Sequence, residues 1–581
     1  MPAKKPLSAN LQARSAILAQ LEAARQLRNT ACAARVEKLL DSLRDVGFRH
    51  ARSLLRWHDA LLFLRAFPQS PAVAANADRL LGETAHQVAR LRQSDKDLAE
   101  FDSEQFSGVA GTRLTDTFTY EVAAWLARRY PRQLKAEWDF DQQARLLAAA
   151  LWRFIPLLDD DSLVEADTPF DHWLSSAAGK EEPLTWLLER FEKLSVTSTE
   201  KTELYDALGI ELHWELEDGP ASRTRARRKV EKLFCHQMPL IRRSQVSLAQ
   251  EFNSPPLPVR KLSLPESEQI LDMCREAVTV RYRELYGTTR GDTNHVYEAE
   301  VGRGVQIFLW GLPPHRRLPL RAYHAGFTLK NGVPINYIEG ISLFEWMEVG
   351  FNTFYAYRDG ETAWIYSKVL HFLRQVTGVT CVSVYPYQLG HENEEAIQSG
   401  AFWFYRKLGF RPGRRELLAL AEKEERRMAA EPRHRTAPGT LRKLAAGHVF
   451  YESGPARHGA WDTFSTRNLG FAVGRCMADS FGGDPDRMRA ASRATLAAAL
   501  SADATHWSSA EQTAFDNFAF VLSLVPSLAD WPAEEKQALL AVIRAKAASE
   551  ETTYLHLLQK HRRLRDTLLR LGSMPSAARQ A

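Results

Sequence analysis

The sequence predicts a central α/β domain, a mixed sheet flanked by helices, between two all-α regions. Three observations predict this fold class. Apolar residues recur at helical spacing over 8–100 and again after about residue 430. From residue 266 a helical pattern gives way to short β-like apolar runs. Asn331-Gly332 separates two of these runs, and this dipeptide between alternating apolar residues is a strong hairpin signal.

The chain has 581 residues, which is long enough for several domains. We expect a helical region at 1–220, a basic segment and linker at 221–261, the α/β domain at 262–425 and a helical region at 426–581. The Pro-rich stretch 253–265 is typical of an extended linker, which favours a boundary just before the central domain.

The composition is that of a soluble globular protein, with 45% hydrophobic and 25% charged residues. No apolar run approaches the roughly 20 residues that cross a bilayer, and the N-terminus lacks a signal-peptide pattern. We therefore expect a cytoplasmic protein without a membrane partner. Five scattered cysteines, none at CxxC spacing, argue against a metal site or a disulfide framework. The net charge of +5 predicts no nucleic-acid binding by the chain as a whole.

In the N-terminal region, the spacing of Ile17, Leu21 and Ala24 is typical of an amphipathic helix. The small-residue turn 107–112 precedes a further helix, which we expect to begin at a cap on Thr115 or Asp116 and to end at Tyr130. We expect the chain to be nearly all α as far as about residue 215.

The central elements follow in the order helix, hairpin, strand, helix, strand, helix, which indicates a mixed sheet. The expected helices are Glu266–Leu285, Thr362–Val376 and Glu394–Leu408, the last followed by Gly409 as its C-terminal stop. The expected strands are Val305–Trp310, Leu320–Leu329, Val333–Ile341, Phe344–Tyr357 and Val379–Tyr385.

Residues 221–243 carry a basic cluster with a single glutamate, Glu231. The basic residues are Arg223, Arg225, Arg227, Arg228, Lys229, Lys232, Arg242 and Arg243. Such a cluster fits two interpretations: a site for a phosphate-bearing or acidic partner, or a solvated helix face that leads into the linker.

The segment SGAFWFYRKLGFRP, 399–412, combines an apolar stripe with a tyrosine at its edge. The stripe that would dock this helix on a sheet is formed by Ile397, Ala401, Phe404 and Leu408. At the edge of the stripe, Tyr405 can be held firmly while its hydroxyl points into a cleft.

This segment resembles the last helix and following strand of the GNAT superfamily of N-acyltransferases. In that family a Phe-Tyr-x-x-x-Gly-Phe pattern packs beside the thioester of acyl-coenzyme A, and the matching residues here are Phe404, Tyr405, Gly409 and Phe410. The resemblance implies a GNAT-like mixed sheet, acetyl-CoA or another acyl-CoA as co-substrate, and an amine acceptor. It also implies that Tyr405 protonates the departing thiolate.

A second point of resemblance is the strand-to-helix turn YRDGETA, 357–363. A helix start is a ready anion site, because its first N–H groups lack partners and its dipole end is positive. GNAT proteins hold the coenzyme A pyrophosphate with a Gln/Arg-x-x-Gly-x-Gly/Ala loop, whose central glycine matches Gly360. Tyr357 and Thr362 depart from that pattern, and Glu361 adds a negative charge. The implied coenzyme-binding residues are Arg358, Gly360, Glu361, Thr362 and Ala363.

GNAT enzymes often use a glutamate of the middle strands as general base, which makes Glu345 and Glu348 the catalytic candidates, beside Glu339. A carboxylate flanked by apolar residues has a raised pKa, which suits proton transfer near neutrality. Either face of the strand could equally be the exposed one. His324 on the preceding strand is a further candidate, or a packed histidine.

The polar segment 386–393 follows a buried strand, where an α/β fold usually places a ligand. We expect Asn352 and Asn393 to contribute to the cofactor site, with His391 and Glu392 nearby. Asn393 is alternatively the N-cap of the following helix.

The residues therefore favour an acyl-CoA-dependent N-acyltransferase of GNAT type with an unknown acceptor. One alternative is a GNAT-like aminoacyl transferase with a carrier- or tRNA-bound donor, whose phosphates would contact the 223–243 cluster. The other is a non-catalytic GNAT-like scaffold that joins two helical regions.

Overall fold

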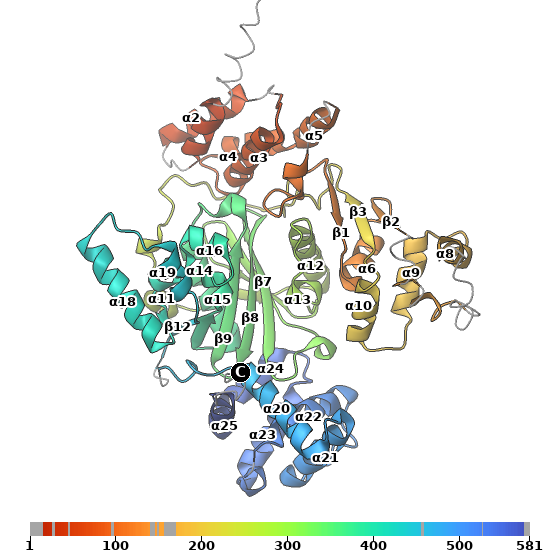
Figure 1. The fold of residues 1–581 in the computed structure, drawn as a ribbon. Coiled ribbons are helices and arrows are strands. Elements are labelled where there is room, and N and C mark those ends of the chain that lie inside the picture. The colour runs from red at the N-terminus through yellow and green to blue at the C-terminus, as the bar shows by residue number, and fades with distance from the viewer. Residues whose placement is uncertain are drawn as a thin grey trace, which may run out of the picture. The chain divides into compact units, whose positions relative to one another are not determined.

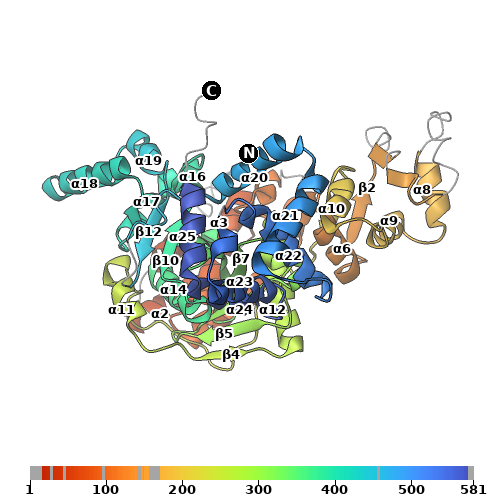
Figure 2. The same ribbon diagram turned by 90° about the horizontal axis from the view of Figure 1, so that it is seen from below.

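The computed structural model describes residues 16–25, 30–43, 47–93, 98–139, 146–147, 150–155, 170–454, 458–525 and 527–573. The chain divides into two compact units. The first unit comprises Met1–Met238 with Asp272–Thr289, and the second comprises Pro239–Leu271 with Arg290–Ala581. Figures 1 and 2 show the elements of both units.

The first unit contains helices and a small sheet. Its helices are α2 (Thr30–Ser42), α3 (Ala51–Ala66), α4 (Pro71–Leu81), α5 (Thr84–Gln93), α6 (Tyr120–Arg129), α8 (Phe170–Ala178), α9 (Pro183–Glu192), α10 (Ser198–Asp206) and α13 (Tyr286–Thr289), with a 3-10 turn, η1 (Ala99–Asp102). Its strands are β1 (Arg113–Asp116), β2 (Leu134–Glu137) and β3 (Glu211–Glu215).

The three strands form an antiparallel sheet in the order β1-β3-β2, so the prediction of an all-α N-terminal region is wrong. On β3, buried Leu212 and Trp214 alternate with the outward-facing His213. This period of two is typical of a half-buried strand, but it extends over five residues only. The predicted helix start at Thr115 or Asp116 is also wrong, because both residues belong to β1 and α6 begins after Thr119.

The basic segment 221–243 contains no α-helix, so the interpretation as a solvated helix face is wrong. Ser222, Arg223 and Thr224 are buried instead. The Arg65 guanidinium donates to the Thr224 carbonyl at 2.6 Å, and His58 Nε2 lies 2.9 Å from the Thr224 hydroxyl. The peptide is therefore held inside the first unit by polar groups of α3.

The second unit is built on a nine-stranded mixed sheet in the order β11-β12-β10-β9-β8-β7-β6-β5-β4. The strands are β4 (Val259–Lys261), β5 (Val296–Glu300), β6 (Val305–Trp310), β7 (Ala322–Lys330), β8 (Val333–Leu343), β9 (Trp346–Thr353), β10 (Cys381–Val384), β11 (Arg411–Pro412) and β12 (Val449–Glu452). Among the strand pairs that the structure describes in this sheet, only β9 and β10 run parallel, while the other pairs are antiparallel. This confirms the predicted large mixed sheet with helices around it (Figure 1).

The predicted hairpin is confirmed, because β7 and β8 pair on either side of Asn331-Gly332. Both turn residues have positive φ, 50° for Asn331 and 78° for Gly332. A type I′ turn requires this backbone, and it matches the twist of the two strands.

The helices around the sheet are α11 (Leu248–Phe252), α14 (Thr362–Thr377), α15 (Pro386–Leu389), α16 (Glu394–Ser399), α17 (Ala401–Arg406), α18 (Arg415–Ala430) and α19 (Pro438–Leu444). The helix α12 (Leu264–Thr279) spans the boundary between the units. The single helix predicted at 394–408 is two helices, because Gly400 adopts a left-handed conformation with φ 67° and ends α16.

The C-terminal region contributes a strand and a group of helices. The strand β12 lies between β10 and β11, so the prediction that 426–581 is all α is wrong. The helices are α20 (Thr466–Phe481), α21 (Pro485–Leu500), α22 (Ser509–Leu522), α23 (Ala533–Ala545), α24 (Glu551–Lys560) and α25 (Arg562–Ser573). Lys546 and Glu551 form a buried ion pair, and Glu551 accepts from the Tyr323 N–H on β7 at 3.1 Å.

Among the described helices, none combines the length and apolar character that a membrane span needs.

Candidate active site

The two parallel strands β9 and β10 separate within the sheet. They pair only over Trp346–Glu348 and Cys381–Ser383. Beyond this point β9 continues to Thr353 along β8 alone, whereas the chain after β10 turns into α15 at Pro386. We call this point of strand separation the opening. It lies at the carboxyl ends of two parallel strands, which is where open α/β sheets bind ligands.

Three residues meet at this opening: Gly350 of β9, Gln388 of α15 and Tyr405 of α17. The Tyr405 hydroxyl donates to Gln388 Oε1 at 3.4 Å. A Cβ placed on Gly350 would lie 3.0 Å from Gln388 Nε2. Because Gly350 has no side chain, the Gln388 amide has room beside β9. Its nitrogen faces β9 and its oxygen faces the Tyr405 hydroxyl.

Tyr405 is held among aromatic rings. The ring of Tyr366 on α14 packs edge-on against it at 5.7 Å between centroids, and that of Phe410 at 5.6 Å. Burial raises the pKa of Tyr405, so the phenol keeps its proton at neutral pH. The neighbouring Tyr366 is also buried, and its hydroxyl has no hydrogen-bond partner within the part of the chain that the structure describes.

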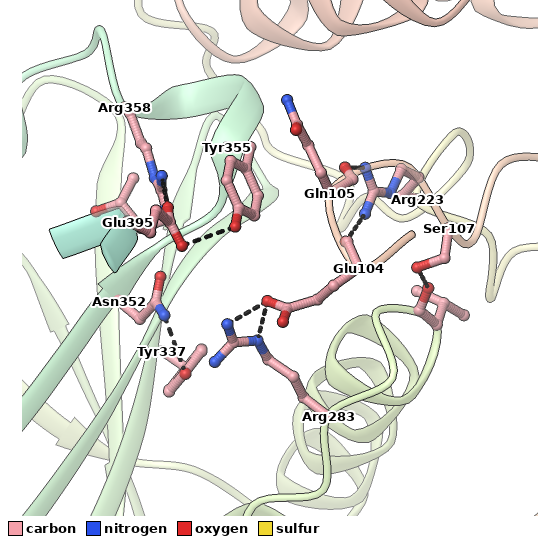
Figure 3. A network of polar contacts seen from close by, with 12 residues as sticks. Glu104, Gln105, Ser107, Arg223, Arg283, Tyr337, Asn352, Tyr355, Arg358 and Glu395 are labelled. Carbon is pink, nitrogen blue, oxygen red and sulfur yellow. Dashed lines mark hydrogen bonds and ion pairs between the residues drawn. The ribbon is translucent and has the colours of Figure 1, made fainter. Parts of the chain in front are cut away.

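One face of the sheet beside the opening is polar. Cross-strand pairing places Tyr337 opposite Asn352 and Glu339 opposite Gly350, and directly opposed residues share a face. The Asn352 amide donates to the Tyr337 hydroxyl at 3.2 Å (Figure 3). Asn352, which the sequence predicts as a site residue, therefore lies beside the opening.

Glu348 lies on this same face, two residues before Gly350. Its carboxylate is 3.0 Å from His448 Nε2, just before β12. The ring of Tyr385 packs edge-on against that imidazole at 5.4 Å between centroids. Glu348 and His448 thus form a partly exposed carboxylate–imidazole pair, and Glu348 is two residues from Gly350 on the same strand.

Glu345, the other predicted base, lies at the opposite end of β9. Its carboxylate accepts hydrogen bonds from Arg565 Nε and from Trp461 Nε1, each at 2.8 Å. Five residues of strand, roughly 17 Å, separate it from Gly350. The structure gives Glu345 an ion pair with α25 and does not bring it together with Tyr405.

His324 is buried and faces away from the opening. Cross-strand pairing places it opposite Gly340, on the face of the sheet that α24 covers. Burial lowers the pKa of His324 to about 4. A buried and neutral His324 agrees with the alternative prediction that this residue is a packed histidine.

The predicted coenzyme-binding residues lie where β9 ends and α14 begins. The Arg358 guanidinium stacks 3.9 Å from the Tyr355 ring centroid and pairs with Glu395 of α16, which also accepts from the Tyr355 hydroxyl at 2.8 Å (Figure 3). Glu361, the N-cap residue of α14, makes no side-chain cap hydrogen bond among the described residues. The N–H groups of Thr362 and Ala363 therefore lie at an uncapped helix start, after Gly360.

The side chain of Glu361 is buried, although its backbone lies at that helix start. Its carboxylate accepts from Arg303 Nε at 3.0 Å and from the Ile241 N–H at 3.0 Å. Its charge is thus compensated by a guanidinium inside the second unit.

In the loop after α15, the Asn393 side chain accepts from the Ala396 N–H at 3.2 Å and caps α16. The N-cap alternative for Asn393 is confirmed. His391 and Glu392 are exposed in the same loop.

Three residues of the 223–243 cluster serve internal contacts in the first unit. Arg223 Nη1 donates to the Gln105 carbonyl at 2.5 Å (Figure 3), Arg225 Nε donates to Asp218 at 2.7 Å, and Arg227 pairs with Asp78. These arginines hold the chain in place, which leaves less positive charge for the predicted phosphate-bearing or acidic partner.

Compared with protein-family models, curated proteins and solved structures, the chain has no match.

Sequence reasoning singled out the segment 386–393 but not Gln388 within it, and it missed His448 and Tyr366. A glutamine two residues after Pro386 carries no motif, and His448 lies in the region predicted to be all α. The one available signal was Gly350 within an otherwise bulky strand, because such a glycine often marks the close approach of another group.

Proposed function

We propose that the second unit is an N-acyltransferase that moves an acyl group from a coenzyme A thioester to an amine. The observation that carries the proposal is the separation of parallel β9 and β10 beside the Tyr405–Gln388 pair. An opening of this kind admits an extended thioester arm between the strands. The protonated phenol of Tyr405 beside this opening supports the proposal.

The start of α14 supports the donor site. Its uncapped N–H groups and positive dipole end suit a pyrophosphate. Arg358 lies in the preceding turn and adds a guanidinium, which pairs well with phosphate oxygens. The sequence raises the objection that Glu361 would repel the phosphates. The contact of this buried carboxylate with Arg303 weakens that objection.

The chemistry follows from the residues around the opening. The amine nitrogen bonds to the thioester carbonyl carbon, the C–S bond breaks, and sulfur takes the phenolic proton of Tyr405. The proton lost from nitrogen passes through Glu348 and His448 to water, and water returns a proton to the phenolate. General acid and base groups of this kind each contribute roughly 10²–10⁴-fold.

Thermal unfolding of the full chain with coenzyme A, acetyl-CoA and longer acyl thioesters tests the donor. A ligand at about 100 times its Kd stabilises the folded state by about 2.7 kcal/mol. We expect an upward shift in Tm with at least one thioester, and a smaller shift in an Arg358→Gln variant. If no thioester or coenzyme A raises Tm, the donor assignment is lost.

A further inference from the structure

The first unit carries a hollow of about 810 Å³. Its lining residues are Arg92, Leu98, Phe101, Asp102, Thr112, Arg113, Thr115, Asp116, Glu215 and Tyr282. This volume lies within the roughly 300–1,000 Å³ of small-molecule sites. None of these residues takes part in the proposed acyl transfer.

One wall of the hollow is the outer face of the three-stranded sheet. Leu114 and Trp214 point to the core, so the next residues along each strand, Arg113, Thr115 and Glu215, point outward. Arg113 Nε lies 4.0 Å from Glu215 across the strands, so these two charges largely compensate each other.

A negative region surrounds Tyr282. Burial, followed by the nearby charges of Asp102 and Asp116, raises the pKa of this phenol. Burial raises the pKa of Asp116 too, and the charge of Glu211 adds to that shift. A cation beside a partly buried carboxylate such as Asp116 stabilises its charged form. This region therefore favours a ligand with an ammonium group.

A positive and an apolar group complete the lining. Arg92 Nη2 donates to the Gly111 carbonyl at 3.2 Å, which fixes this guanidinium at the wall. Its planar fork suits a carboxylate. Leu98 and Phe101 supply an apolar surface in the same hollow.

We propose that this hollow binds a small zwitterion with an apolar group, of the amino acid or short peptide class. Its ammonium lies at Asp116 and Tyr282, its carboxylate at Arg92, and its apolar group on Leu98 and Phe101. The inference is independent of the acyl transfer proposed for the second unit.

Isothermal titration of the full chain tests this with matched probes. L-phenylalanine and phenylalanyl-phenylalanine carry both charges, phenylalaninamide lacks the carboxylate, and N-acetyl-phenylalanine lacks the ammonium. We expect at least one of the two zwitterions to bind at least 10-fold more tightly than either single-charge probe. The proposal is overturned if neither zwitterion binds, or if a single-charge probe binds as tightly.

Variants separate this pocket from adventitious binding. We expect Asp116→Asn and Arg92→Gln each to weaken zwitterion binding at least 10-fold, with Tm in the absence of ligand as the check on folding. Lys135→Gln on the neighbouring strand β2, which is outside the lining, should leave binding unchanged. Equal binding by all these variants would place the ligand elsewhere and overturn the proposal.

Discussion

The hydroxyl of Tyr405 donates a hydrogen bond to the side-chain amide oxygen of Gln388 over 3.4 Å. The two residues come from different helices, α17 and α15, and they meet where β9 and β10 separate. The contact is long for an O–H···O bond, for which 2.7–2.8 Å is usual. A phenol held this weakly can turn its proton toward a substrate atom, and this property leads to the first prediction.

Tyr405→Phe removes the hydroxyl and keeps the ring in its aromatic surroundings. We expect kcat for acyl transfer to fall by about 100-fold, because the thiolate loses its proton donor. The free energy of unfolding should change by no more than about 1 kcal/mol, the contribution of one hydrogen bond. Steady-state kinetics and urea unfolding measure the two effects. Tyr451→Phe, on β12, is the matched control, and equal loss in both variants would remove the special role of Tyr405.

Gly350→Ala places a methyl group 3.0 Å from Gln388 Nε2. The amide is the end of a flexible side chain, so it should move aside with little loss of stability. The Tyr405 hydroxyl then loses its partner, and we expect kcat/KM to fall about 10-fold or more while Tm stays within a few degrees. The control is Gly439→Ala, where the added methyl meets nothing within 4 Å. Unchanged kinetics in Gly350→Ala would separate Gln388 from catalysis.

Glu361→Ala breaks a buried contact at the start of α14. It leaves Arg303 and the Ile241 N–H without their shared acceptor. Loss of one partner of a buried ion pair costs about 3–5 kcal/mol. Arg303 keeps some exposure, so we expect about 3 kcal/mol by urea denaturation. Glu395→Ala, which breaks the exposed pair with Arg358, should cost about 0–1 kcal/mol, and similar losses in both variants would contradict this ranking.

His324 makes stability depend on pH, because burial lowers its pKa from 6.5 to about 4 in the folded chain. Above pH 6.5 the ring is neutral in both states. As pH falls from 6.5 to about 4, the unfolded chain takes up the proton first, so the folded state loses stability by about 3 kcal/mol at most. Urea unfolding at pH 7, 5.5 and 4.5 should show a steeper decline in the wild type than in His324→Asn. Parallel declines would show that His324 does not titrate this way.

Local chemistry in the sequence determined several elements of the second unit. Asn331-Gly332 determined the β7–β8 turn, because few other residue pairs adopt two successive positive φ angles at low cost. The helix predicted at 362–376 is α14, Thr362–Thr377, and it ends at Gly378 in the left-handed conformation. Strand β6 has the predicted bounds Val305–Trp310. The turn, the helix α14 and the strand β6 each depend on residues that are close together in the sequence.

Contacts between residues far apart in sequence were decided only by the tertiary structure. In the sequence, Glu345 has the pattern of a strand carboxylate that could lie beside a substrate. In the structure its partner is Arg565, which is 220 residues away. The pairing of His448 with Glu348 requires β12 to insert between β10 and β11. The three-stranded sheet needs β3 to reach back to β1 across roughly a hundred residues. Sequence patterns report which residues are apolar and how they repeat. They do not report which distant group a polar side chain meets, because that depends on how the strands and helices pack together.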